Sequence, residues 1–245
     1  MNIVLSGEER YEIAGRTHLV KEGEFLFLSA RARARVIVAA RDPVRALCIY
    51  LPTEDADAAI PCIDAQEGEE ADPGLEDPCL VLSASGSPFG RALRRSARLV
   101  LGDPLSGPML ADRIAGHVKR ELPGFADTLW AKLERISATK PSTRVYLLER
   151  LERARAFLHD NDKSPVGLAR VSRVAGISEF HLSRLFTALY GESPTRYHRG
   201  LRLRKISAML AGGSYTLDQA AEAFGYSDAA SLSRALRRGD RKPVN

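Results

Sequence analysis

The feature that most restricts the fold is a repeat near the end of the chain, because both copies have to form the same structural unit. Five positions of the first copy align with positions 49 residues later. In order, they are Leu168, Val171, Val174, Ala175 and Gly176, aligned with Leu217, Ala220, Ala223, Phe224 and Gly225. Beyond the glycine the offset is 50 positions, and Ser178, Leu182, Ser183 and Arg184 match Asp228, Leu232, Ser233 and Arg234. The second copy therefore has a turn that is one residue longer.

Each copy has the pattern of a short helix, a tight glycine turn and a second helix that starts with a capping residue. Glycine suits such a turn because it adopts positive φ angles at no steric cost where the chain reverses between packed helices. Ser193 followed by Pro194 is typical of a helix start and predicts a helix over about residues 194–210 between the copies. At about 1.5 Å per residue this helix is about 25 Å long, so it would separate the two copies of the repeat by about that distance.

The back of the chain resembles the AraC/XylS family of transcription regulators over about residues 145–238. The matching text is LARVSRVAGISEFHLSRLFTALYGESPTRYHRGLRLRKISAMLAGG, followed by LDQAAEAFGYSDAASLSRALRR. The resemblance implies an all-α DNA-binding domain over 141–245. It has a helix-turn-helix unit at about 166–190, a linker helix at about 194–210 and a second unit at about 216–238. In that family the two units enter successive major grooves on one face of double-stranded DNA.

The resemblance also implies which side chains face the bases. In the first unit these are Phe180, Ser183 and Arg184, with Glu179 and His181 nearby; in the second they are Ala229, Ala230, Ser233 and Arg234, with Ser231 nearby. Each arginine can present a bidentate fork to guanine, and Phe180 either contacts thymine methyl groups or is a core residue beside Phe186. Since alanine cannot hydrogen-bond a base edge, we expect the first unit to carry most of the sequence specificity.

The charge of the chain is unevenly distributed. Residues 141–245 contain 18 Lys and Arg against 10 Asp and Glu, whereas residues 1–140 contain 18 against 21, within an overall net charge of +5. The basic back part suits contact with a polyanion, although an ordinary solvated surface would also fit. Four arginines of the predicted linker helix are expected to contact phosphates or simply to be solvated: Arg196, Arg199, Arg202 and Arg204.

The front of the chain, residues 1–51, predicts short strands at 3–5, 11–13, 25–28, 36–38 and 47–51, separated by turn signals. Many short strands at this spacing indicate a β-sandwich or barrel. The segment LSGEERYEIAGRTHLVKEGEFLFL resembles the cupin-like barrel that in this family senses a small molecule and helps the protein to dimerise. The expected fold is therefore α+β and multidomain, with a cupin-like barrel, connecting helices and an all-α DNA reader.

Two segments lie between the predicted strands and the predicted DNA-binding domain. Residues 52–78 hold ten acidic residues, four prolines and no Lys or Arg, which predicts a long solvated loop. The connecting region, 79–140, predicts two amphipathic helices, one before and one after a break at Pro123-Gly124. Their apolar stripes are Leu110, Ile114, Val118 and Leu122, and then Phe125, Leu129, Trp130, Leu133 and Ile136. These helices pack either on the barrel of their own chain or on a second subunit.

Other function classes have weak support in the sequence. A metal-dependent cupin enzyme needs two or more histidines and a carboxylate, but the front strands hold only His18, with Glu22 and Glu24 nearby. We therefore expect no catalysis, no metal and no cofactor. A front half that only dimerises the protein and senses nothing remains an alternative. The three cysteines, Cys48, Cys62 and Cys79, have no metal-like spacing and fit idle thiols in a reducing cytoplasm.

The expected partners are double-stranded DNA, a small-molecule effector, RNA polymerase and a second copy of the chain, and no membrane. We expect a cytoplasmic protein, because residues 1–15 lack the pattern of a secretion signal. Two departures from the family bear on these expectations. The chain ends in GDRKPVN where the family usually continues with another helix, and less sequence than usual precedes the first strand. The second unit is therefore expected to be held less rigidly, and either the barrel is incomplete or its start lies elsewhere than assigned.

Overall fold

The computed structural model describes residues 1–13, 15–28, 33–37, 43–51, 79–102, 107–138 and 141–239. The chain divides into two compact units, Met1–Glu152 (the N-terminal unit) and Arg153–Asn245 (the C-terminal unit). The boundary falls within α4 (Pro141–Asp160), which begins where the sequence predicts the start of the DNA-binding domain. The predicted acidic loop at 52–78, Cys62 and the end of the chain from residue 240 lie outside the described residues.

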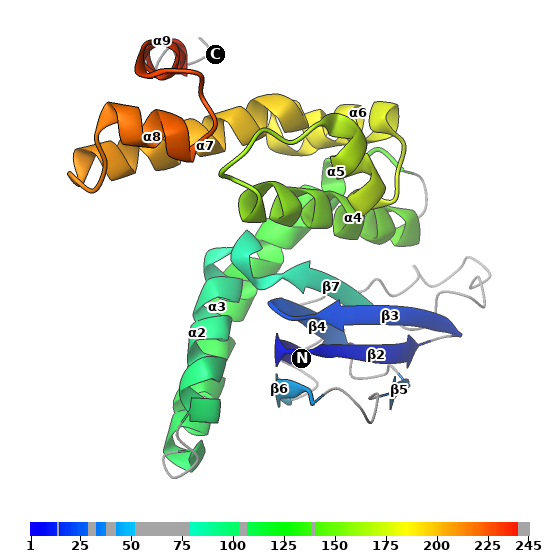
Figure 1. Cartoon of the computed structure of the whole chain (residues 1–245). Helices are drawn as coiled ribbons and strands as arrows, with labels where there is room; N and C mark the ends of the chain where they lie inside the picture. Colours follow the sequence, from blue (N-terminus) through cyan, green and yellow to red (C-terminus); the bar gives the residue numbers. More distant parts are fainter. Residues whose placement is uncertain are drawn as a thin grey trace. The chain divides into compact units, whose positions relative to one another are not determined.

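The N-terminal unit contains two antiparallel sheets, drawn in blue to cyan in Figure 1. The larger sheet has the order β6 (Arg45–Cys48), β1 (Asn2–Ser6), β4 (Glu24–Leu28) and β7 (Cys79–Ser83). The smaller has the order β3 (Arg16–Lys21), β2 (Glu8–Ile13) and β5 (Ala34–Ile37). The predicted β-rich, cupin-like front domain is confirmed, although no pairing between the described strands closes the two sheets into a barrel.

The core of this unit follows the two-residue period of the strands. Exposed and buried residues alternate along β2, and its inward side chains are Glu9, Tyr11 and Ile13. The apolar ones pack with residues of the larger sheet that include Val4 and Leu26. At one end of β2 the Tyr11 hydroxyl donates to the Glu9 carboxylate at 2.7 Å, so this buried acid has a hydrogen-bond partner.

The outer face of the larger sheet is covered by helices of the same chain. After the 3-10 turn η1 (Ala84–Gly86) come α2 (Pro88–Gly102) and α3 (Gly107–Glu134), which run side by side in Figure 1. Four rings form an aromatic cluster between sheet and helices, with centroids 4.7 to 6.4 Å apart: Phe25, Phe27, Phe89 and Phe125. The connecting region therefore packs on its own chain, as one of the two alternatives expected.

The predicted break at Pro123-Gly124 is wrong, because α3 continues through it. Proline lacks the N–H that the helix needs and clashes with the preceding turn, at a typical cost of about 3 kcal/mol. Here Pro123 lies on the exposed side, while the stripe of Ile114, Val118 and Leu122 continues through Ala126 and Leu129. Burial of this continuous stripe on both sides of Pro123 offsets the local cost and keeps one helix instead of two.

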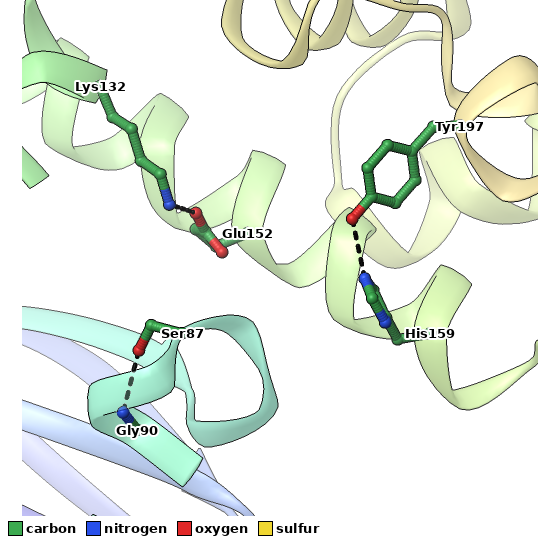
Figure 2. A network of polar contacts seen from close by, with 6 residues as sticks. All are labelled: Ser87, Gly90, Lys132, Glu152, His159 and Tyr197. Atoms are coloured by element: carbon green, nitrogen blue, oxygen red, sulfur yellow. Dashed lines mark hydrogen bonds and ion pairs between the residues drawn. The ribbon is translucent and has the colours of Figure 1, made fainter. Parts of the chain in front are cut away.

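Two polar contacts fix the ends of these helices, and Figure 2 shows both. The hydroxyl of Ser87 accepts from the N–H of Gly90 at 2.9 Å and so caps the start of α2. Gly90 cannot be replaced without movement, because a Cβ there would lie 2.6 Å from the carbonyl oxygen of Ala84. The Lys132 ammonium lies 2.5 Å from the Glu152 carboxylate, which ties α3 to α4 within the N-terminal unit.

The C-terminal unit is helical in all its described elements. It contains α5 (Leu168–Ala175), α6 (Glu179–Tyr190), α7 (Pro194–Ala211), α8 (Leu217–Ala223) and α9 (Ala229–Gly239). Gly176 and Gly225 follow α5 and α8 with φ angles of 67° and 69°, which explains the glycine in each copy of the repeat. The expected all-α domain with two helix-turn-helix units is confirmed.

Histidines lie at the joint between the end of α4 and α7. His159 Nε2 is 2.8 Å from the Tyr197 hydroxyl (Figure 2), and His198 Nε2 donates to the carbonyl of Asn161 at 3.1 Å. Burial lowers the pKa of His159, with a further contribution from Arg155, and burial also lowers the pKa of His198. The surroundings in the folded unit therefore favour the neutral form of both imidazoles.

We expect this unit to become less stable in mild acid. An unfolded histidine has a pKa of about 6.5, so the unfolded chain binds protons before the folded one as the pH falls. The contribution of both residues is complete above that pH and is lost as the pH falls through their lowered values. Urea unfolding between about pH 5.5 and 7.5 measures how the free energy of unfolding depends on pH. His159→Phe should make this dependence weaker. His181→Asn, at an exposed position, is the control; equal stability across the range would contradict the prediction.

Candidate nucleic-acid interface

The first candidate recognition helix is α6, and its two faces differ sharply. Its inward face is made of buried side chains: Leu182, Leu185, Phe186 and Leu189. Its outward face contains the residues that the sequence predicts to face the bases: Glu179, Phe180, His181 and Arg184 are exposed, and Ser183 is partly exposed. The hydroxyl of Ser178 accepts from the N–H of His181 and caps the helix, so the first turn is held in place. The structure thus brings the five predicted residues onto one accessible helix.

The exposure of Phe180 decides between the two interpretations of this residue, a contact with bases or a place in the core. Its side chain is 76% exposed, whereas Phe186 is fully buried against Tyr190 and Tyr197. The alternative that Phe180 is a core residue beside Phe186 is therefore wrong. A large apolar side chain left in water at the start of a helix contributes nothing to the core and is available for contact with a partner.

The second candidate recognition helix is α9, in which Leu232 and Ala235 face the core. Of the predicted base-facing residues, Ala230 and Arg234 are exposed, and Ala229, Ser231 and Ser233 are partly exposed. The N-cap is Asp228, whose carboxylate accepts from the N–H of Ser231 at 2.6 Å. This bond lowers the pKa of Asp228, which keeps the cap ionised.

The two matched arginines differ in their surroundings. Arg234 lies along its own helix, with Nε donating to the Ala230 carbonyl at 3.3 Å and Nη2 to the Ser231 hydroxyl at 3.0 Å. Arg184 makes no hydrogen bond or ion pair with any residue in the described part of the chain. Its guanidinium can therefore reach a partner without first breaking contacts, which Arg234 has to do.

Sequence reasoning missed two further basic residues on α9. Arg237 and Arg238 are exposed in its last turn and correspond, at the offset of 50, to Thr187 and Ala188 of α6. The repeat itself contains the signal, since both positions change from uncharged to basic between the copies. The second helix therefore combines small side chains at its start with three arginines from its middle to its end.

Arg202 is placed differently from the other arginines of the linker helix. Arg196, Arg199 and Arg204 are exposed on α7, but Arg202 is only 6% exposed. Its Nη2 donates to the carbonyls of Lys163, at 3.4 Å, and Phe224. The expectation that Arg202 contacts phosphates or is simply solvated is therefore wrong, because its side chain is buried and its Nη2 is bonded inside the protein.

His18 lies with both ring nitrogens 3.4 Å from the Cys79 sulfur, which places this residue beside a buried thiol. No group of three or more metal-ligating side chains gathers among the described residues. Within that same part of the chain, no helix is long and apolar enough to cross a membrane.

Two family models match the chain. An AraC-like ligand binding domain matches residues 1–106, and a helix-turn-helix domain matches residues 171–239, so that together they cover more than half of the chain. The chain belongs to the AraC/XylS family of transcription regulators. The family resemblance found in the repeat is thereby confirmed, and so is the resemblance of the front half to the family's ligand-binding domain.

Curated relatives match the back of the chain. The multiple antibiotic resistance protein MarA of Salmonella typhimurium and that of Escherichia coli are each 30% identical to it over 81 residues. The match covers 33% of this chain and 64% of each relative, so the chain spans less than two thirds of the length of these relatives. Among solved structures, ToxT from Vibrio cholerae with a bound unsaturated fatty acid covers 97% of this chain and 82% of its own. Its TM-score is 0.34 at 10% identity, too low to establish a shared property.

Proposed function

We propose that this protein is a sequence-specific transcription regulator that binds double-stranded DNA with α6 and α9 and is controlled by a small-molecule effector at its N-terminal unit. The observation that carries the proposal is the outward face of α6. On this one capped helix lie the guanidinium of Arg184, which has no hydrogen bond within the described residues, the exposed ring of Phe180 and several polar groups. Such a helix fits the major groove, where donors, acceptors and methyl groups distinguish the base pairs.

Each of the five predicted base-facing residues of α6 has a role in this proposal. Arg184 contacts O6 and N7 of a guanine, Phe180 packs on thymine methyl groups, and Glu179 can accept from a cytosine amino group. Ser183 contributes a short hydroxyl to a base edge. His181, beside the helix N-terminus, contacts a phosphate, because the N-terminal end of a helix favours negative charge.

The second unit contributes differently. Ala229 and Ala230 can touch only thymine methyl groups, while Ser231 and Ser233 offer short hydroxyls and Arg234 one guanine contact. Arg237 and Arg238 add phosphate contacts in the last turn of α9, where their charge also suits the helix dipole. We infer that this unit supplies mainly affinity and the first unit mainly specificity.

Selection of bound duplexes from a random DNA pool with the full-length protein tests the proposal. The expected result is two short segments about one helical turn apart, a sharply defined one read by α6 and a loosely defined one read by α9. Equal definition of both segments would contradict the division of roles between the units. Selection that enriches no sequence would contradict the proposed function itself.

Arg184→Ala should separate base reading from charge. Losing a bidentate guanine contact should cost about 1–3 kcal/mol on the selected duplex and much less on random DNA of equal length. The measurement is a pair of titrations at one fixed salt concentration. Arg173→Ala removes another exposed arginine, from α5 and outside the proposed base-reading set, and serves as the control. Equal losses on both duplexes would make Arg184 a phosphate contact instead.

The effector is proposed from the match of residues 1–106 to the family's ligand-binding domain. A compound that binds only the folded protein stabilises it by about 2.7 kcal/mol at a concentration 100 times its dissociation constant. We therefore expect at least one metabolite in a broad thermal-shift screen to raise the melting temperature of the full-length protein. A screen without any such compound would favour the alternative in which the front half is purely structural.

The remaining parts of the proposal follow from this role. A regulator of this kind acts in the cytoplasm, contacts RNA polymerase at its promoters and can bind as a homodimer. No catalytic activity is proposed, since DNA recognition and effector binding need none.

A further inference from the structure

One face of the linker helix α7 contacts the turn that follows α4, and two of its residues, His198 and Arg202, are buried. His198, Arg202 and Lys205 lie three and four positions apart and therefore share one face of α7. All three bind the short turn at residues 161–163 that follows α4. His198 donates to the Asn161 carbonyl at 3.1 Å, Arg202 to the Lys163 carbonyl at 3.4 Å, and the Lys205 ammonium lies 2.6 Å from the Asp162 carboxylate. We call these three side chains and this turn the linker clamp.

The turn in the linker clamp belongs to the body of the first helix-turn-helix unit. The last turns of α4 contact the helices of that unit through rings: the Arg155 guanidinium lies 5.6 Å from the Tyr190 ring, and the Arg170 guanidinium lies 5.2 Å from the Phe157 ring. His159 binds the Tyr197 hydroxyl close to the start of α7. A side chain that grips this turn is therefore fixed to the first unit.

Arg202 also reaches the second unit. Its Nη2 donates to the carbonyl of Phe224, the residue that ends α8 and opens the turn to α9, and its guanidinium lies 5.5 Å from the Tyr226 ring in the same turn. The carbonyl end of a helix is partly negative, which strengthens a bond to a cation. Arg202 is therefore a single buried side chain bonded to both helix-turn-helix units. A change in the relative position of these two units would have to break one of its bonds.

We propose that Arg202, supported by Lys205 and Asp162, is a positioning residue that fixes the separation of α6 and α9 and thereby the number of base pairs between the two DNA segments that the protein reads. The inference rests on the proposed function, since it assigns a spacing rule to the DNA bound there. One base pair moves a site by about 3.4 Å along the duplex and rotates it by about 35°. Two units held rigidly accept one spacing, whereas two loosely joined units accept several at lower affinity.

The test uses the full-length protein and the selected duplex, with one or two base pairs inserted or deleted between the two segments. Wild-type protein should lose roughly 100-fold in affinity for one inserted base pair, because one unit then loses its site. Arg202→Met should bind the original duplex roughly tenfold more weakly but lose less than about tenfold on the altered ones. Arg204→Met removes an exposed charge from the same helix and should weaken binding to every spacing equally.

Asp162→Asn separates positioning from charge. Removing a negative charge should by attraction alone tighten binding to every duplex. Loss of its bond to Lys205 should instead reduce the discrimination between spacings, as in Arg202→Met. This variant also carries the test if Arg202→Met does not fold, which circular dichroism and melting temperature decide.

The outcomes distinguish a failure of the proposed function from a failure of the positioning role of Arg202. Wild-type protein that selects no duplex would contradict the proposed function and leave no spacing to measure. Wild-type protein that binds a selected duplex while folded Arg202→Met and Asp162→Asn keep the same discrimination between spacings would overturn the positioning role. Relaxed spacing in both variants but not in Arg204→Met is the result that the linker clamp requires.

Discussion

The affinity of residues 141–245 for DNA is expected to fall roughly 1000-fold between about 50 and 200 mM salt. This fragment contains all of α4 and the C-terminal unit, with 18 basic against 10 acidic residues. Exposed arginines lie on α5, α6, α7 and α9, and about six phosphate contacts would give a slope near −5 in a plot of log affinity against log salt. Such a slope arises because each neutralised phosphate releases condensed counterions.

Titration of a labelled duplex at a series of salt concentrations measures this slope. The control is the fragment 1–140, in which acidic residues outnumber basic ones and which should not bind under the same conditions. Removing one phosphate contact by Arg237→Ala should reduce the slope by about one. A 141–245 fragment that is helical by circular dichroism but does not bind at low salt would contradict the proposed function.

Phe25→Ala should destabilise the N-terminal unit by about 3–5 kcal/mol. Phe25 is fully buried at the centre of the aromatic cluster, within 6.1 Å of the rings of Phe27, Phe89 and Phe125. Truncation removes its own apolar burial and leaves a cavity between the sheet and two helices, which can close only in part. Urea unfolding of the full-length protein, followed at the transition of this unit, measures the loss.

Phe180→Ala is the matched control, because it makes the same chemical change at an exposed position. It should change stability by no more than about 0.5 kcal/mol while weakening binding to the selected duplex. A destabilisation by Phe25→Ala below 1 kcal/mol, on the order of a surface change, would mean that the helices do not depend on the aromatic cluster. The pair therefore distinguishes residues that hold the fold from residues that contact the partner.

The back of the chain was predictable because repetition and capping residues act locally. Gly176 and Gly225 mark the two turns, and Ser178 and Asp228 mark the helix starts that follow. The prediction of strands in the front half was less complete, since β3 and β7 were not predicted. β7 is a short apolar run with its first four residues buried, and such a run has no period from which a strand is distinguished from a helix.

Other features depend on tertiary contacts that a pattern does not contain. α2 was not predicted, because its buried positions at Phe89, Gly90, Leu93 and Ala97 include two small residues that give little hydrophobic signal. Pro123 argues for a break, and only the packing of α3 on both sides of it keeps the helix intact. Arg202 looks like its exposed neighbours in the sequence, and only its contacts with Lys163 and Phe224 reveal its internal role.

The two-faced construction of α6 has a consequence for evolution. Its core contacts come from one set of positions and its outward groups from another, so the second set can change with little effect on folding. Relatives with this scaffold can thus acquire new target genes by drift at Glu179, Phe180, His181 and Arg184 while the scaffold persists. For the same reason, these four positions are the ones to randomise when the regulator is to be directed to a chosen promoter.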